Sequence, residues 1–130
     1  MALANLLSHD VVGAQTMSTP IAGRTILRCV KDLGRVLAIA RLSKAEEVAG
    51  WTRPWLKALK ACFPKSWRLL GRRAGDGLRA LMGDASAFEQ AHHTTRVGLL
   101  LGQGITEDHL RAVAEQLFET ALDPLRAACR

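Results

Sequence analysis

Histidine and cysteine are the residues of this chain best suited to catalysis or metal binding, but their spacing favours neither. His92 and His93 form the one histidine pair, and adjacent helical positions point about 100° apart, so the two rings do not readily share a metal ion. Cys29, Cys62 and Cys129 lie far apart, without the CxxC spacing of a zinc or redox site. No thiol has a base partner that the sequence reveals. We therefore predict a protein that is not an enzyme, with no catalytic residue, metal or cofactor.

The strongest chemical signal is a basic, tryptophan-rich segment, WTRPWLKALKACFPKSWRLLGRR, which covers residues 51–73. Indole rings beside cationic side chains suit a membrane–water interface that carries anionic lipid. The same mixture could stack on bases and bind phosphates. A structural interpretation, with the rings in the core and the charges in water, also stays open. The predicted interface aromatics are Trp51, Trp55 and Trp67, and the predicted anion-binding residues of the segment are Arg53, Lys57, Lys60, Lys65, Arg68, Arg72 and Arg73.

A second basic feature is the amphipathic pattern of residues 21–42, IAGRTILRCVKDLGRVLAIARL. Its period predicts a helix with one apolar stripe and one basic stripe. Pro20 suits the first helical turn, and Ser18 or Thr19 could cap it. The basic stripe needs water or an anion, and the alternative is that it faces the acidic end of this chain. Its members are Arg24, Arg28, Lys31 and Arg35.

The charge of the chain is divided along its length. Residues 21–82 carry a net charge of +10, whereas residues 83–130 carry −3. A basic field of this size favours an anionic partner, such as lipid head groups, nucleic acid or an acidic protein. No zinc-finger spacing, RNP-like aromatic motif or KH-type loop accompanies it.

Composition and periodicity predict an all-α fold, an irregular bundle of four to six amphipathic helices in a single domain of residues 1–130. Ala, Leu and Arg dominate and β-branched residues rarely cluster. We expect a peripheral N-terminal segment over 1–20, a basic helical part over 21–82 and an acidic helical hairpin over 83–130. The predicted core residues are Ile26, Val30, Leu33, Leu37, Leu110, Val113, Leu117 and Phe118.

Capping and breaking residues predict where the other helices begin and end. A first helix should run from Ala2 to about Val12, and the S-x-x-E spacing of Ser43 predicts a helix from Lys44. Gly50, Pro54 and Pro64 interrupt this helix, and residues 65–82 resume as a helix weakened by glycines. Asp84 or Ser86 should cap a helix over 85–101, and Thr106 should cap the last one, which Pro124 kinks or ends near Leu122.

Two stretches, over residues 22–38 and 65–81, resemble the peroxisomal membrane-elongation family, the peroxin-eleven proteins. Arg28, Lys31-Asp32 and Arg35-Val36-Leu37 keep the spacing of that family's early basic helix, although Lys31-Asp32 stands where the family has Gln-Tyr. Residues 67–72, WRLLGR, are similar to its second element. The family's later membrane-embedded hairpins have no counterpart after Asp84. The resemblance implies a basic amphipathic helix that inserts into one leaflet and bends it.

The leading prediction is a non-enzymatic helical interaction or assembly protein whose basic, Trp-rich middle docks on an anionic surface. That surface is either a membrane face or a larger membrane-associated complex in which the chain is an accessory subunit. An organellar complex is one such option. The alternatives are a nucleic-acid-binding or ribonucleoprotein subunit and a small-molecule binder within the bundle. An odd cysteine count and no long apolar run indicate an intracellular, reducing compartment, with an organelle or a membrane surface also compatible. The oligomeric state stays open.

Overall fold

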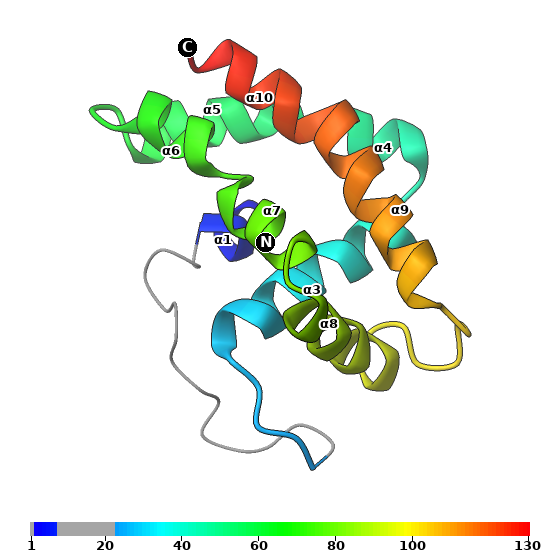
Figure 1. The fold of residues 1–130 in the computed structure, drawn as a ribbon. Helices are drawn as coiled ribbons and strands as arrows, with labels where there is room; N and C mark the ends of the chain where they lie inside the picture. The colour runs from blue at the N-terminus through cyan, green and yellow to red at the C-terminus, as the bar shows by residue number, and fades with distance from the viewer. Residues whose placement is uncertain (1, 8–22) are drawn as a thin grey trace.

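The computed structural model describes residues 2–7 and 23–130, and helices build all of its regular structure within those ranges (Figure 1). The all-α fold class is therefore confirmed. The helices are α1 (Ala2–Leu7), α3 (Arg28–Leu42), α4 (Ala45–Ala49), α5 (Thr52–Cys62), α6 (Trp67–Arg73), α7 (Asp76–Met82), α8 (Ala85–Val97), α9 (Glu107–Leu117), the π-helical segment η1 (Phe118–Leu122) and α10 (Asp123–Ala128).

The α3 helix is the centre of the core, because α1, α7, α8 and α9 all pack against it. Val36 and Ala38 are fully buried together with the predicted stripe of Val30, Leu33 and Leu37. A helix that is apolar over so much of its circumference belongs inside a protein. The predicted core is confirmed, except that Val113 is half-buried and packs at its edge.

The start of α3 differs from the prediction, because the helix begins at Arg28 and not near residue 21. Gly23 adopts φ +78°, a left-handed turn that suits glycine. The chain stays non-helical up to Leu27, which is itself extended, and Ile26 is fully buried in the core. Arg24 consequently lies outside the helix that was expected to carry it. The proposed caps at Ser18 and Thr19 lie outside the described residues.

The α1 helix is part of the core, which corrects the peripheral position expected for residues 1–20 as far as this helix is concerned. Leu6 is fully buried and Ala2 nearly so, because the helix packs across α3. The predicted continuation of α1 to Val12 falls outside the described residues.

Prolines and glycines divide the middle of the chain into four short helices. Ser43 donates its hydroxyl proton to the Ile39 carbonyl at 2.8 Å and so closes α3, while the Glu47 carboxylate accepts the Lys44 N–H at 3.3 Å at the start of α4. The helix cap therefore lies one residue later than the S-x-x-E spacing predicted. Pro54 sits in the first turn of α5, where its missing N–H costs no hydrogen bond. Pro64 lies in the turn between α5 and α6.

The two predicted N-caps of the C-terminal half are confirmed. Asp84 accepts the Ala87 N–H at 3.0 Å at the start of α8, and Thr106 accepts the His109 N–H at 3.2 Å at the start of α9. However, α8 ends at Val97, four residues before the predicted end.

The helical run that starts at α9 continues through η1 into α10, past Pro124. Proline has no N–H and its ring crowds the carbonyl four residues earlier. A π turn directly before Pro124 accommodates this ring. Of the two predicted outcomes near Leu122, an end of the helix is wrong, because the regular α-helix is interrupted there by the π turn and then continues as α10. The Thr52 hydroxyl donates to the Ala121 carbonyl at 2.9 Å and thereby ties the start of α5 to the π turn. Beyond the turn, α10 packs against α5 and α6.

Candidate anion-binding surface

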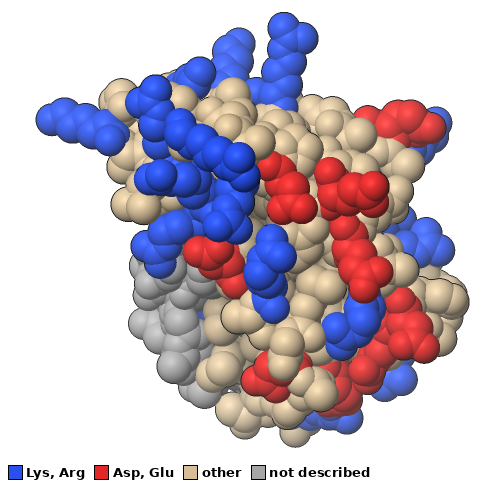
Figure 2. Space-filling model, turned by 45° about the horizontal axis from the view of Figure 1, so that its top comes forward, with Lys and Arg blue, Asp and Glu red and all other residues tan. Residues whose placement is uncertain are grey.

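The α5 and α6 helices and the turn between them carry a cluster of positive charge, here called the basic α5–α6 surface. Residues 51–73 contain seven Lys and Arg and no Asp or Glu, and all seven side chains are exposed. One of them, Arg73, lies 4.0 Å from Asp76. Within the described part of the chain the other six make no ion pair. Figure 2 shows Lys and Arg gathered over the upper left of the view, whereas Asp and Glu, with other Lys and Arg among them, lie over the rest of this face. The six are Arg53, Lys57, Lys60, Lys65, Arg68 and Arg72.

The tryptophans of this segment are buried or half-buried and pack within the fold. Trp55 is only 9% exposed, which corrects the prediction that it faces a partner. Trp51 is half-buried and lies against Trp55, with ring centroids 5.4 Å apart. Trp67 is half-buried, and the charged groups of Lys60 and Arg68 lie 4.7 and 4.4 Å from its ring centroid. These cation–π contacts hold the two cations in place and leave little of the ring free to stack.

Two exposed apolar side chains, on α6 and in the turn before it, lie outside the predicted set of interface aromatics. Phe63, in the turn between α5 and α6, is 43% exposed, and Leu69 on α6 is 49% exposed. Beside Phe63 lies an apolar groove of about 370 Å³ between α1 and α5, whose lining includes Leu3, Leu7 and Cys62. In the sequence both side chains stand close to cations, Phe63 before Lys65 and Leu69 after Arg68.

The C-terminal helix adds a cation that the sequence analysis assigned to the acidic hairpin. Arg126 on α10 lines the same narrow groove as Arg72 on α6. The helices meet where Gly71 faces the fully buried Cys129. Burial raises the pKa of the Cys129 thiol, although nearby Lys60, Arg72 and Arg68 act to lower it. In the structure this thiol packs against Gly71 where α6 and α10 cross.

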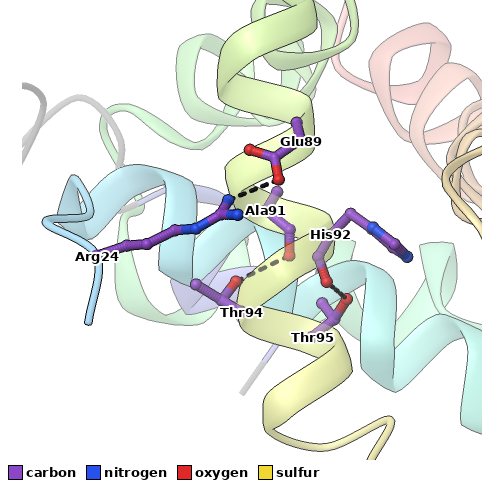
Figure 3. A network of polar contacts seen from close by, with 6 residues as sticks. All are labelled: Arg24, Glu89, Ala91, His92, Thr94 and Thr95. Atoms are coloured by element: carbon purple, nitrogen blue, oxygen red, sulfur yellow. Dashed lines mark hydrogen bonds and ion pairs between the residues drawn. The ribbon is translucent and has the colours of Figure 1, made fainter. Parts of the chain in front are cut away.

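The predicted basic stripe of the 21–42 segment is divided in the structure. Arg24 donates to Glu89 on α8 at 2.6 Å, and this hydrogen bond lowers the pKa of the Glu89 carboxyl (Figure 3). Arg28 is exposed at the start of α3, whereas Lys31 and Arg35 are half-buried beside the end of α8. In Figure 1, α5 and α6 lie at the top of the molecule and α8 at the bottom. The two predicted sets of basic residues therefore form separate sites.

The histidine pair has structural positions in α8. His92 Nε2 lies 2.7 Å from the Ile105 carbonyl and links α8 to the segment before α9. His93 is buried, and its ring nitrogens have no hydrogen-bond partner among the described residues. Within residues 2–7 and 23–130, no group of three His, Cys, Asp or Glu side chains is arranged to hold a metal ion. In the same ranges no helix is both long and apolar enough to cross a bilayer.

No family model, characterised protein or solved structure matches this chain. The resemblance to the peroxin-eleven proteins therefore stays a prediction, and the function has to be inferred from the surfaces themselves.

Proposed function

We propose that this chain is a non-enzymatic, peripheral interaction protein that docks on an anionic membrane surface through its basic α5–α6 surface. The observation that carries the proposal is a set of six exposed cations that make no ion pair with any described residue, in the same segment as the exposed side chains of Phe63 and Leu69. Cations that have no internal partner are free to meet lipid phosphates. Apolar side chains among them add burial below the head groups.

The expected affinity suits reversible attachment. Each Lys or Arg close to an anionic leaflet contributes about 1 kcal/mol, so six in full contact supply on the order of 6 kcal/mol. Complete burial of a Phe side chain adds about 2 kcal/mol, of which the exposed part of Phe63 can realise only a fraction. Binding should therefore weaken strongly as salt screens the charges.

The aromatic geometry favours a membrane over nucleic acid. Binding of single strands uses aromatic faces that are open to stack on bases. Trp55 is buried, and Trp67 lies beneath Lys60 and Arg68. The apolar tips that are exposed, Phe63 and Leu69, suit a lipid interface better than a base stack.

Co-sedimentation with vesicles tests this proposal. We expect the protein to bind vesicles of phosphatidylglycerol and phosphatidylcholine at low salt, to bind less at physiological salt, and not to bind phosphatidylcholine alone. The double variant Lys57→Gln/Lys65→Gln removes two exposed cations and should weaken binding about thirtyfold. Phe63→Ser should weaken it further without changing the salt dependence.

The matched control is Arg41→Gln/Lys44→Gln, which removes two exposed cations at the α3–α4 junction. This control should bind vesicles like the wild type. Equal losses in the two double variants, or no binding to anionic vesicles at low salt, would reject the proposal. In the second case, an electrophoretic shift of RNA or capture of an acidic protein by the same residues would assign the surface to those partners.

A further inference from the structure

A second cavity, of about 210 Å³, lies between α3 and the C-terminal end of α8. Two cations from α3 enter it on one side, and two threonines and two aliphatic side chains of the α8 end line the other. The lining residues that carry the argument are Lys31, Arg35, Thr94, Thr95, Val97 and Leu99. Nothing in the proposed membrane docking uses these residues.

Lys31 and Arg35 lie one helical turn apart on α3 and are both half-buried. Neither makes an ion pair with any described residue. Like charges at this spacing repel each other, and partial burial removes water that would otherwise solvate them. The cavity thus holds two positive charges that have no ion-pair partner in the described part of the chain, and an anion placed between them would relieve both penalties.

The threonines restrict what else the cavity can recognise. Thr94 donates its hydroxyl proton to the Ala91 carbonyl at 2.8 Å, and Thr95 donates to the His92 carbonyl at 2.8 Å (Figure 3). Their oxygens can therefore only accept further hydrogen bonds. The side-chain donors that line the cavity and remain available to a ligand are those of Lys31 and Arg35, so the polar part of a fitting ligand is an acceptor with negative charge.

The rim of the cavity is apolar and open. Val97 and Leu99 are 38% and 53% exposed, and Leu101 in the following turn is 73% exposed. A bare inorganic anion would make no use of these exposed aliphatic side chains, because it has no apolar surface to bury against them. It is the surface that a hydrocarbon chain attached to the anion would cover.

We infer that this cavity binds a single-chain carboxylate amphiphile, a medium-chain fatty acid anion. The carboxylate lies between the Lys31 ammonium and the Arg35 guanidinium, and Arg35 supplies two parallel N–H donors. The first carbons of the chain fill the remaining volume, and the rest lies along Val97 and Leu99. Because α5–α6 and α8 lie at opposite ends of the molecule (Figure 1), the site operates independently of the basic α5–α6 surface.

Titration of the isotopically labelled protein with sodium octanoate tests the inference by NMR. We expect octanoate to shift the amide signals of Thr94, Thr95 and Gly98, which line the cavity. Octanol keeps the chain without the charge, and acetate keeps the charge without the chain. Each should bind at least about tenfold more weakly than octanoate, because each loses one of the two sets of contacts.

Three variants make the test specific to the cavity. Arg35→Gln removes one cation and should weaken octanoate about tenfold. Arg28→Gln is the matched control, because Arg28 is an exposed arginine of the same helix outside the cavity, and it should bind octanoate unchanged. Leu99→Ser alters an exposed side chain that the core does not need, so this variant should fold normally, lose affinity for octanoate and keep that for acetate.

Several results would overturn the inference. One is equal affinity for octanoate and octanol, since the cations would then play no part. Another is an equal effect of Arg35→Gln and Arg28→Gln. A third is binding to phosphatidylglycerol vesicles through Lys31 and Arg35 with no response to octanoate, which would make this face a bilayer contact instead.

Discussion

Replacing Gly71 with alanine should destabilise the protein through one contact, that between α6 and α10. A Cβ atom at Gly71 would lie 2.2 Å from Cys129 Sγ and 3.1 Å from its Cβ. The first distance is about 1.2 Å below the 3.4 Å at which ordinary van der Waals contact begins. Both residues are buried, so the helices must separate or the thiol must leave its rotamer.

The size of the effect follows from two opposing terms. Forcing an extra carbon into a packed site costs about 1–3 kcal/mol. Replacing glycine by alanine within a helix raises the free energy of unfolding by about 0.5–1 kcal/mol. We therefore expect Gly71→Ala to lower the free energy of unfolding by about 1–2 kcal/mol. Urea denaturation followed by circular dichroism measures this quantity, and the slope of the transition should stay unchanged.

A double-mutant cycle identifies the cause. In a Cys129→Ala background the Sγ atom is gone and the 3.1 Å approach to the Cβ atom remains, so Gly71→Ala should cost clearly less than in the wild type. Gly83→Ala is the control, because a Cβ there would first meet the Ala80 carbonyl oxygen at 3.6 Å. If Gly71→Ala is as stable as the wild type, or if its full cost persists without the Cys129 sulfur, the reasoning about this helix crossing is wrong.

Three further predictions use other parts of the molecule. Trp55→Ala should lower the free energy of unfolding by about 3–5 kcal/mol, because the ring is buried, and an unchanged urea midpoint would show that the ring is not packed. Cys62 is exposed, whereas Cys129 is buried and has a raised thiol pKa. A colorimetric thiol reagent should therefore modify Cys62 rapidly and Cys129 only after unfolding. Mass spectrometry of the labelled protein can show which cysteine has reacted. Arg24 lowers the pKa of Glu89, so this pair stabilises the fold above the ordinary carboxyl pKa and loses its effect as the pH falls through the lowered value. Glu89→Gln should thus be slightly less stable than the wild type at neutral pH and equal to it in strong acid, in urea titrations at each pH, with the reverse order contradicting the assignment.

The residues that could be predicted from sequence are those whose position depends on helical period or on local hydrogen bonds. The stripe of Val30, Leu33 and Leu37 identified the face of α3 that enters the core, because a helix repeats every 3.6 residues wherever it is placed. Asp84 and Thr106 were found as caps because the groups that they bind lie three residues away.

The errors arose where distant segments decide the outcome. The helical period placed Lys31 and Arg35 on one basic stripe with Arg24. In the structure the first two lie in a cavity beside the end of α8, and Arg24 precedes the helix and bonds to Glu89. Arg126 lines the same groove as Arg72 because α10 packs against α6. Period and spacing contain no information about such pairings, so the candidate sites became visible as sites only in three dimensions.

The π turn η1 sets how far α10 is rotated about the helix axis relative to α9. An α-helix advances about 100° per residue, and a π turn contains one residue more than an α turn. Phe118–Leu122 therefore sets α10 at a different rotation from the one that an unbroken continuation of α9 would have. The α9 helix packs on α3 and α8, while α10 presents the buried Leu125 and Cys129 toward α5 and α6. Deleting one residue from this turn would leave the composition and charge of the α9–η1–α10 run almost unchanged. It would nevertheless rotate α10 by about a quarter turn and carry its apolar face away from the helices that bear the basic α5–α6 surface.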